Sequence, residues 1–514
     1  MNGTDVDTIP KQAIEVFSQP QSRIPDPTIL VIFGASGDLT KRKLLPALFH
    51  LEQSGLLPEE FAVVGVARRD LTATFAADMR AGIIDGGVRS NDSRLSNFME
   101  KVSYHALHFD DSKAYAGLKE KLAEIDRKRG TEGNRLFYLA VAPEYFQEVI
   151  NNLGQHRMNV GDDGGHARVI IEKPFGHDLA SAVQLNDAVA HVFNEDQIFR
   201  IDHYLGKETV QNIFVFRFAQ ALFEPLWNSQ YIDNVQITAA ESIGIEGRGP
   251  FYEKAGASRD ILQNHMMEML AYVAMDRPRT ASAEDVIAEK VKLFKAIRPV
   301  PAANAVRGQY GKGIVDGREV RAYREEERVH PESSTETFAA VKMEIETPRW
   351  TGVPLYLRAG KRLAKRVTEV VIQFKPPAHQ LFSGALAGPC RGIPANLIRL
   401  RIQPDEGIKI VFGNKLPIPT TAICPVEAVF RYADAFGKST ANGYERLLLD
   451  AMLADPTLFT HREAVEASWA LYTALLQQWA AAPSRDFPNY ASGSWGPTGS
   501  DELLARDGRE WHAV

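Results

Sequence analysis

The 514-residue chain has little cysteine, no long apolar run and no excess of basic charge. Only Cys390 and Cys424 occur, and they form neither a metal-ligand spacing nor a disulfide framework, which is typical of a reducing compartment. No apolar run approaches the ~18 residues that span a bilayer, and the acidic N-terminus lacks the basic flank of a signal peptide. We therefore expect a cytoplasmic protein without a membrane partner.

The charge balance limits the partners further. The formal net charge is −6, and acidic and basic residues are mixed along the chain. A nucleic-acid-binding protein would show a basic stripe instead, so nucleic acid is excluded as a partner. Any anion that binds here must be met by a local cluster of Lys, Arg and His. The length predicts two domains, because it exceeds what one ordinary hydrophobic core supports.

Residues 27–200 have the pattern of a doubly wound, Rossmann-type α/β domain. Apolar runs with little polar alternation cover residues 28–33, 61–67, 135–142 and 167–173. Helical patterns separate them, so the runs predict strands of a parallel sheet that is buried on both faces. Residues 1–26, which mix polar residues with prolines, predict a flexible N-terminal arm.

Residues 201–514 have a different pattern. From about residue 335 the strands alternate, with Val341 and Met343 on one face and Lys342 and Glu344 on the other. Such alternation indicates an antiparallel sheet with one polar face. Helical patterns lie near residues 258–276 and 461–482. We therefore predict a large α+β domain with a mostly antiparallel sheet.

A glycine-rich turn follows the first predicted strand. It consists of Gly34, Ala35, Ser36, Gly37, Asp38 and Leu39. Small residues let the backbone approach a pyrophosphate, and the N-terminus of the following helix offers free N–H groups. The spacing G-x-x-G differs from the usual G-x-G-x-x-G, so a tight turn without a ligand stays open as an alternative.

The second predicted strand ends in Arg68 and Arg69. Folds that bind NAD commonly place an acidic residue here for the ribose 2′-hydroxyl. A guanidinium is suited to a 2′-phosphate, so the pair favours NADP over NAD. A solvated basic turn is the alternative for this pair alone.

Three polar segments carry candidate chemistry. Residues 200–208 bring a carboxylate, an imidazole and an ammonium close together, and in a helix His203 and Lys207 would share one face as an anion site. Residues 172–176 follow a strand at the end where ligands of doubly wound sheets bind. Residues 259–265 open a helix and offer a second histidine, His265. Any one of these segments alone could be structural.

Taken together, the strings RIDHYLGKE, GASGDL, EKPFG and QNH resemble the glucose-6-phosphate dehydrogenase family, and the resemblance extends from about residue 28 to the C-terminal region. The bacterial members are the more similar ones at the C-terminal end. The resemblance implies oxidation of glucose 6-phosphate at C1 to 6-phosphogluconolactone, the first step of the oxidative pentose phosphate pathway. It also implies hydride transfer to NADP, with NAD as a weaker alternative, no metal, and a homodimer or homotetramer.

The resemblance assigns roles to single residues. His265 matches the general base, and Asp202 matches the carboxylate that orients it. Substrate-binding roles fall on Lys173, His203, Tyr204, Lys207, Glu241, Asp260, Lys361, Arg366 and Gln403. Coenzyme-binding roles fall on Gly34, Ala35, Ser36, Gly37, Asp38, Leu39, Arg68 and Lys173. Residues 201–514 would thus bind substrate and form the oligomer interface.

The chemistry independently requires such a base. The C1 hydroxyl must lose its proton as the hydride leaves, and a neutral imidazole accepts a proton near neutral pH. Some relatives bind a second, structural NADP, of which Arg358 and Arg401 resemble a part. Val367 and Val411 stand where basic side chains are expected, so we do not expect that site. The isomer of the Lys173–Pro174 bond is left unassigned.

Two other functions stay open. An oxidoreductase for an unphosphorylated sugar also combines a Rossmann domain, an antiparallel sheet and a Glu-Lys-Pro string, but it has no need for the His203–Lys207 anion site. An inactive regulator that binds sugar phosphates would be expected to lose His265 or Asp202, and both are present.

Overall fold

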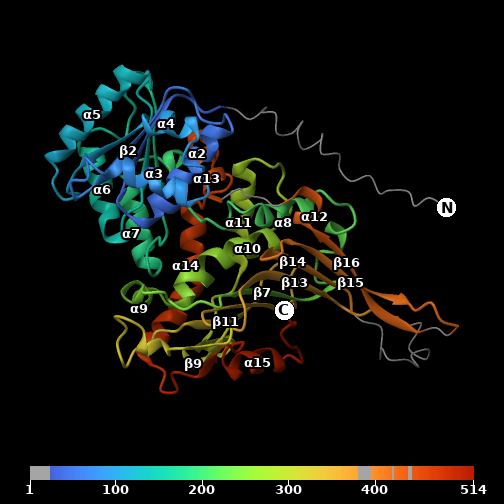
Figure 1. Cartoon of the computed structure of the whole chain (residues 1–514). Helices are drawn as coiled ribbons and strands as arrows, with labels where there is room; N and C mark the ends of the chain where they lie inside the picture. Colours follow the sequence, from blue (N-terminus) through green and yellow to red (C-terminus); the bar gives the residue numbers. More distant parts are fainter. Residues whose placement is uncertain (1–23, 380–394, 420–421, 438–442) are drawn as a thin grey trace, which may run out of the picture. The chain divides into compact units, whose positions relative to one another are not determined.

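A computed structural model describes residues 24–379, 395–419, 422–437 and 443–514 (Figure 1). The chain divides into two compact units, each discontinuous in sequence. Unit 1 contains Met1–Glu208, Arg279–Ile287 and Thr440–Glu466, and unit 2 contains Thr209–Pro278, Ala288–Ser439 and Ala467–Val514. Up to residue 23, the predicted N-terminal arm lies outside the described residues.

Unit 1 contains a six-stranded parallel sheet in the order β3-β2-β1-β4-β5-β6. The strands are β1 (Thr28–Phe33), β2 (Phe61–Ala67), β3 (Val102–Ala106), β4 (Arg135–Leu139), β5 (Ala167–Ile171) and β6 (Ile198–Arg200). The order reverses between β1 and β4, which makes the sheet doubly wound and sets the point where ligands of such folds bind. The predicted Rossmann-type architecture is confirmed.

Every residue of β1 is buried, because helices cover both faces of this sheet. On one face, Ile29, Val31 and Phe33 share a core with residues of α5 and α6. The helices of unit 1 are η1 (Thr40–Leu44, a π-helix), α2 (Leu45–Gln53), α3 (Phe75–Asp85), α4 (Ser93–Met99), α5 (Ala114–Arg129), α6 (Phe146–Gln155), α7 (Leu179–Ala190) and α13 (Gly443–Met452). Short 3₁₀ turns are η2 (Pro143–Tyr145), η3 (Asp162–Gly164) and η4 (Glu195–Gln197).

Unit 2 contains an eight-stranded sheet in the order β16-β15-β14-β13-β7-β12-β11-β8. Its strands are β7 (Ile232–Ala240), β8 (Ala305–Gly308), β11 (Phe338–Met343), β12 (Leu355–Gly360), β13 (Val367–Phe374), β14 (Leu397–Gln403), β15 (Gly407–Lys415) and β16 (Ile423–Arg431). β7 and β12 pair in parallel and the other neighbours pair antiparallel. The expected mostly antiparallel sheet is therefore confirmed.

A smaller sheet and several helices complete unit 2. The three-stranded sheet has the order β10-β9-β17, from β9 (Tyr310–Val315), β10 (Arg318–Val320) and β17 (Tyr490–Ser492). The helices of unit 2 are η5 (Glu224–Leu226), α9 (Gly249–Ala257), η6 (Ser258–Met266, a π-helix), α10 (Met267–Ala274), η7 (Ala302–Asn304), η8 (Tyr323–Glu325), α12 (Tyr432–Phe436) and α15 (Thr498–Ala505). Three of the unit boundaries fall within α8 (Glu208–Phe218), α11 (Ala283–Ala296) and α14 (Arg462–Ala481).

Of the two cysteines, Cys424 lies buried in β16. Cys390 lies outside the described residues.

Among the residues that the structure describes, no helix combines the length and the apolar character needed to cross a bilayer.

Candidate active site

The glycine-rich turn of unit 1 links β1 to a helix that begins at Asp38. Gly34 has a φ of +83°, and a Cβ there would lie 2.2 Å from the carbonyl oxygen of Ala140. Only glycine fits this close approach to the backbone that follows β4. The helix N-terminus and the exposed Ser36 and Gly37 therefore lie at the switch point of the sheet.

A pocket of about 610 Å³ lies beside this turn, and its lining includes Gly34, Ser36 and Arg68. The lining does not include Ala35, Gly37, Asp38 or Leu39. It does include Arg69, which the sequence places beside Arg68 at the end of β2. The pocket thus joins the glycine-rich turn to the arginines at the end of β2.

Tyr145 is a lining residue that the sequence did not reveal. Its hydroxyl accepts a hydrogen bond of 3.0 Å from Arg68 Nη1, and the guanidinium lies 5.2 Å from the centre of its ring. The aromatic face orients the arginine without cancelling its charge. Tyr145 is the last residue of the turn η2, which follows β4. A polar aromatic residue just after Pro143 is the sequence feature that could have indicated this pocket residue. His108 also lines the pocket and was missed.

The segment after β6 forms consecutive turns rather than a helix, and α8 begins only at Glu208. The helical face proposed for His203 and Lys207 is therefore wrong. Asp202 is buried, and its Oδ1 accepts a hydrogen bond of 2.9 Å from the backbone N–H of Tyr204. A side chain that accepts from the backbone two residues on stabilises a turn in place of a helix.

The ring of Tyr204 joins His203 and Lys207 despite the missing helix. The His203 ring centre lies 5.2 Å from it, and Lys207 Nζ lies 4.0 Å from it. The structure therefore brings His203, Tyr204 and Lys207 together. Arg200, just before this segment, is buried and bonds to Glu195 at 2.6 and 3.1 Å, which fixes the end of β6.

Lys173 follows β5 at the same end of the parallel sheet. The Lys173–Pro174 peptide bond, left unassigned from the sequence, is cis. The neighbouring Glu172 accepts hydrogen bonds from Tyr138 at 2.5 Å and Tyr444 at 3.3 Å. Burial raises the pKa of the Glu172 carboxyl, and the negative charge of Asp202 raises it further, whereas the tyrosine hydrogen bonds and Lys173 oppose that rise. No role was predicted from the sequence for Glu172, Tyr138 or Tyr444.

In unit 2, His265 and Asp260 lie on the π-helix η6 and are both buried. The sequence predicted a helix here, but not its wider winding. Glu336 Oε1 accepts a hydrogen bond of 3.1 Å from the N–H of Ser258 at the start of η6. Ser468 of α14 donates to the carbonyl of Gln263 at 2.7 Å. These side chains hold the segment near its two ends.

Four of the predicted substrate-binding residues lie at one edge of the large sheet, formed by the ends of its central strands. They are Glu241, Lys361, Arg366 and Gln403. Ala240 pairs with both Gly360 of β12 and Val367 of β13, and Thr368 pairs with Gln403 of β14. The ends of four strands, β7, β12, β13 and β14, thus meet there, and η6 packs against β7, β12 and the adjacent strand β11.

The four side chains at this edge differ in their surroundings. Lys361 is almost fully buried and forms an ion pair with Glu241. Gln403 donates a hydrogen bond of 3.2 Å to the Thr368 hydroxyl. Arg366 is exposed and directly precedes β13. The edge therefore combines polar groups with one exposed cation.

Arg358, considered for a second coenzyme site, lies under two tryptophans of its own chain. Its guanidinium is 4.2 Å from the ring centre of Trp511 and 5.1 Å from that of Trp495. Burial lowers the pKa of Arg358 to about 10. Arg401, the other candidate, pairs with Glu369 at 2.9 Å.

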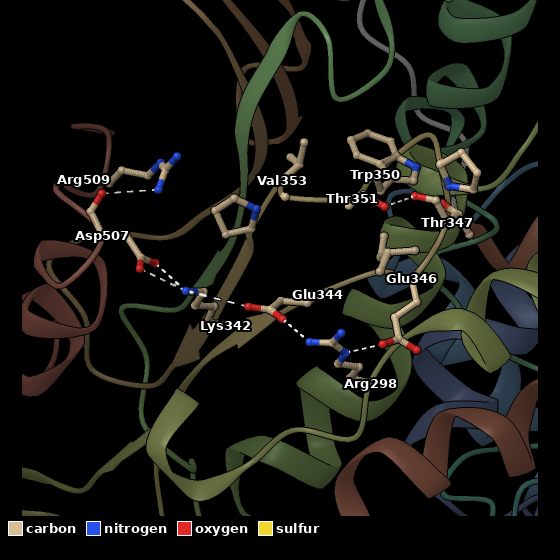
Figure 2. Close-up of a pocket in the computed structure, with 14 residues that line it drawn as sticks. Arg298, Lys342, Glu344, Glu346, Thr347, Trp350, Thr351, Val353, Asp507 and Arg509 are labelled. Atoms are coloured by element: carbon tan, nitrogen blue, oxygen red, sulfur yellow. Dashed lines mark hydrogen bonds and ion pairs between the residues drawn. The ribbon is translucent and has the colours of Figure 1, made fainter.

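A second pocket of about 620 Å³ in unit 2 contains none of the predicted site residues (Figure 2). A chain of ion pairs runs along its wall: Lys342 pairs with Asp507 at 2.8 Å and lies 4.0 Å from Glu344. Arg298 pairs with Glu344 at 3.0 Å and also with Glu346. Because these charges match one another, the pocket lacks the excess of cations that a phosphate site needs.

Two family models match the chain. Residues 31–212 match "Glucose-6-phosphate dehydrogenase, NAD binding domain", and residues 214–512 match "Glucose-6-phosphate dehydrogenase, C-terminal domain". Glucose-6-phosphate 1-dehydrogenase of Chlamydia muridarum is 47% identical over 493 residues, which are 95% of this chain and 97% of that protein. The Bacillus subtilis enzyme of the same name is 42% identical, with 94% of this chain and 98% of that protein covered.

Solved structures agree with these relatives. A glucose-6-phosphate dehydrogenase in complex with glucose 6-phosphate has a TM-score of 0.86 and 35% identity, and the match covers 96% of this chain and 100% of that one. The Mycobacterium avium glucose-6-phosphate 1-dehydrogenase has a TM-score of 0.81 and 34% identity, with 95% and 99% covered. The chain belongs to the glucose-6-phosphate dehydrogenase family.

Proposed function

We propose that the protein oxidises glucose 6-phosphate at C1 to 6-phosphogluconolactone and that NADP accepts the hydride. The observation that carries this proposal is the family relationship over nearly the whole chain, with the string RIDHYLGKE intact at residues 200–208. The pairing of Arg68 with Tyr145 supports NADP over NAD, because an oriented guanidinium suits a 2′-phosphate.

In the proposed mechanism, His203, Tyr204 and Lys207 bind the 6-phosphate, and Lys173 binds sugar and coenzyme near the reacting end. Glu241, Asp260, Lys361, Arg366 and Gln403 complete the substrate contacts. His265 removes the C1 hydroxyl proton, and Asp202 orients that imidazole and stabilises its cation. A bound nicotinamide supplies the hydride acceptor, and its dinucleotide is held by the 34–39 turn and Arg68.

The domain boundaries and the assembly belong to the same proposal. Residues 27–200 form the coenzyme-binding domain, and residues 201–514 bind substrate and form the interface of a homodimer or homotetramer. The family models, whose boundary lies between residues 212 and 214, support a division near this point. A cytoplasmic location stays a prediction from the sequence.

The direct test is to follow NADPH or NADH formation by absorbance with glucose 6-phosphate or free glucose, each paired with NADP or NAD. We expect the glucose 6-phosphate and NADP pair to be fastest. Loss of the phosphate contacts should lower kcat/KM on glucose by at least about 10²-fold, since charge-assisted hydrogen bonds contribute several kcal/mol together. Equal rates on both sugars would favour the oxidoreductase for unphosphorylated sugars, and no lactone with any pair would favour the inactive regulator.

Replacing Lys207 or His203 by alanine should chiefly weaken binding of the sugar phosphate. Losing one charge-assisted contact should raise KM for glucose 6-phosphate by about 10- to 10²-fold. Steady-state kinetics check this result, with Lys128→Ala on the exposed end of α5 as the matched control. Unchanged KM in both variants would show that the anion site lies elsewhere.

Arg68→Ala should weaken NADP binding far more than NAD binding, because only NADP carries the 2′-phosphate. Dissociation constants for both coenzymes provide the measurement, and the Arg68→Ala/Arg69→Ala double variant tests whether the neighbouring arginine shares the contact. Tyr145→Phe, which keeps the ring but loses the hydroxyl, separates hydrogen bonding from stacking. Equal losses for NADP and NAD would contradict the 2′-phosphate assignment.

His265→Asn should lower kcat by roughly 10²–10⁴ through loss of the general base, with little change in substrate affinity. The base must be neutral to accept the proton, so wild-type kcat/KM falls as pH is lowered through its pKa. This acidic limb should vanish in His265→Asn, and Asp202→Asn should also lower kcat. The competing assignment is His203: an acidic limb that persists in His265→Asn and disappears in His203→Asn would reverse the two histidines.

A further inference from the structure

Glu172 joins the end of the parallel sheet to helix α13 within unit 1. It directly follows β5, and its Oε1 accepts hydrogen bonds from the hydroxyls of Tyr138 and Tyr444. Tyr138 lies on the neighbouring strand β4 and is fully buried, whereas Tyr444 lies in the first turn of α13. One carboxylate oxygen therefore connects two segments that are 306 residues apart, counted from Tyr138 to Tyr444.

Tyr444 in turn contacts the segment to which we assign phosphate binding. Its ring is stacked on that of His203, with ring centres 6.3 Å apart and an angle of 11° between the planes. The backbone before it also packs closely: a Cβ on Gly206 would lie 2.4 Å from the carbonyl oxygen of Gly443. Residues 443–444 are thus in contact with both ends of the 203–206 turn.

The contacts continue from His203 to the cation. The rings of His203 and Tyr204 meet edge to face at 61°, and Lys207 Nζ lies over the Tyr204 ring. Each side chain in this series limits the rotation of the next. The series therefore begins at Glu172, which touches neither Lys207 nor the phosphate in the proposed assignment.

We propose that Glu172 is a positioning residue for the phosphate site, which it holds in its binding arrangement through Tyr444 and His203. This inference rests on the proposed function, since it takes His203 and Lys207 as the phosphate-binding groups. The physical reason is preorganisation: flexible cations lose affinity when binding itself must fix their conformation. A carboxylate suits the task because one oxygen accepts from both hydroxyls, and an apolar side chain would leave both unsatisfied.

The test uses the full-length protein and three variants: Glu172→Gln, Tyr444→Phe and the double variant. Tyr444→Phe keeps the ring that stacks on His203 and removes only the hydroxyl. Two quantities are measured, KM for glucose 6-phosphate and the competitive inhibition constant of inorganic phosphate. Each single variant should raise both by about threefold to tenfold, the range of one lost hydrogen bond, with kcat changed less than about twofold.

The double variant tests the connection itself. Because both single changes break the same hydrogen bond, their effects should not multiply, and the double variant should resemble the more affected single variant. Fully multiplicative effects would give the two side chains independent roles and overturn the inference. Tyr115→Phe is the matched control: it also removes a buried hydroxyl from unit 1, one that donates to the carbonyl of Phe109, and it should leave the phosphate inhibition constant unchanged.

Lys207→Ala separates the two levels of the proposal. If it raises the phosphate inhibition constant while Glu172→Gln and Tyr444→Phe do not, the positioning role is wrong and the proposed function stands. A lower melting temperature with an unchanged inhibition constant would likewise make Glu172 purely structural. If Lys207→Ala also leaves the constant unchanged, the phosphate assignment is wrong and the inference is overturned with it.

Discussion

The site depends on one electrostatic constraint: a chain with a net charge of −6 must concentrate positive charge locally to bind phosphorylated molecules. The candidate cations are therefore held by neighbours that orient them. Arg68 lies against Tyr145 and Lys207 lies over Tyr204. An aromatic face attracts a cation but carries no net charge, so it does not neutralise the cation that it orients. Such a partner reconciles a fixed side chain with strong anion binding.

Lys361 differs from these cations, because its partner is an acidic side chain rather than an aromatic ring. It is almost fully buried and forms an ion pair with Glu241 at the edge of the large sheet. The pair is close to neutral as a whole, yet it presents both donors and acceptors. Such a group suits the hydroxyls of a sugar better than its phosphate, because neutral hydroxyls need hydrogen-bond partners rather than charge. The substrate roles proposed for the two units therefore differ in the electrostatics of their residues.

The sequence predicted the architecture well because burial determines it. β1 and β2 are buried throughout, so both appear as unbroken apolar runs. β3, at the edge of the sheet, alternates buried and partly exposed residues and was missed. The gathering of Glu241, Lys361, Arg366 and Gln403 could not be predicted without the family resemblance. It depends on β12 pairing in parallel with β7 inside an otherwise antiparallel sheet, and no local pattern encodes that pairing.

The two segments richest in candidate catalytic residues are also those where regular helix geometry failed as a prediction. Residues 202–207 form turns because Asp202 binds the backbone of Tyr204, and residues 258–266 are wound as a π-helix. A π-helix is less stable than an α-helix of the same residues, so it persists only where other contacts offset the difference. Here Glu336 satisfies the N–H of Ser258, and Ser468 satisfies the carbonyl of Gln263. Because such contacts come from distant parts of the chain, the direction of the His265 side chain is set by tertiary structure rather than by helical periodicity.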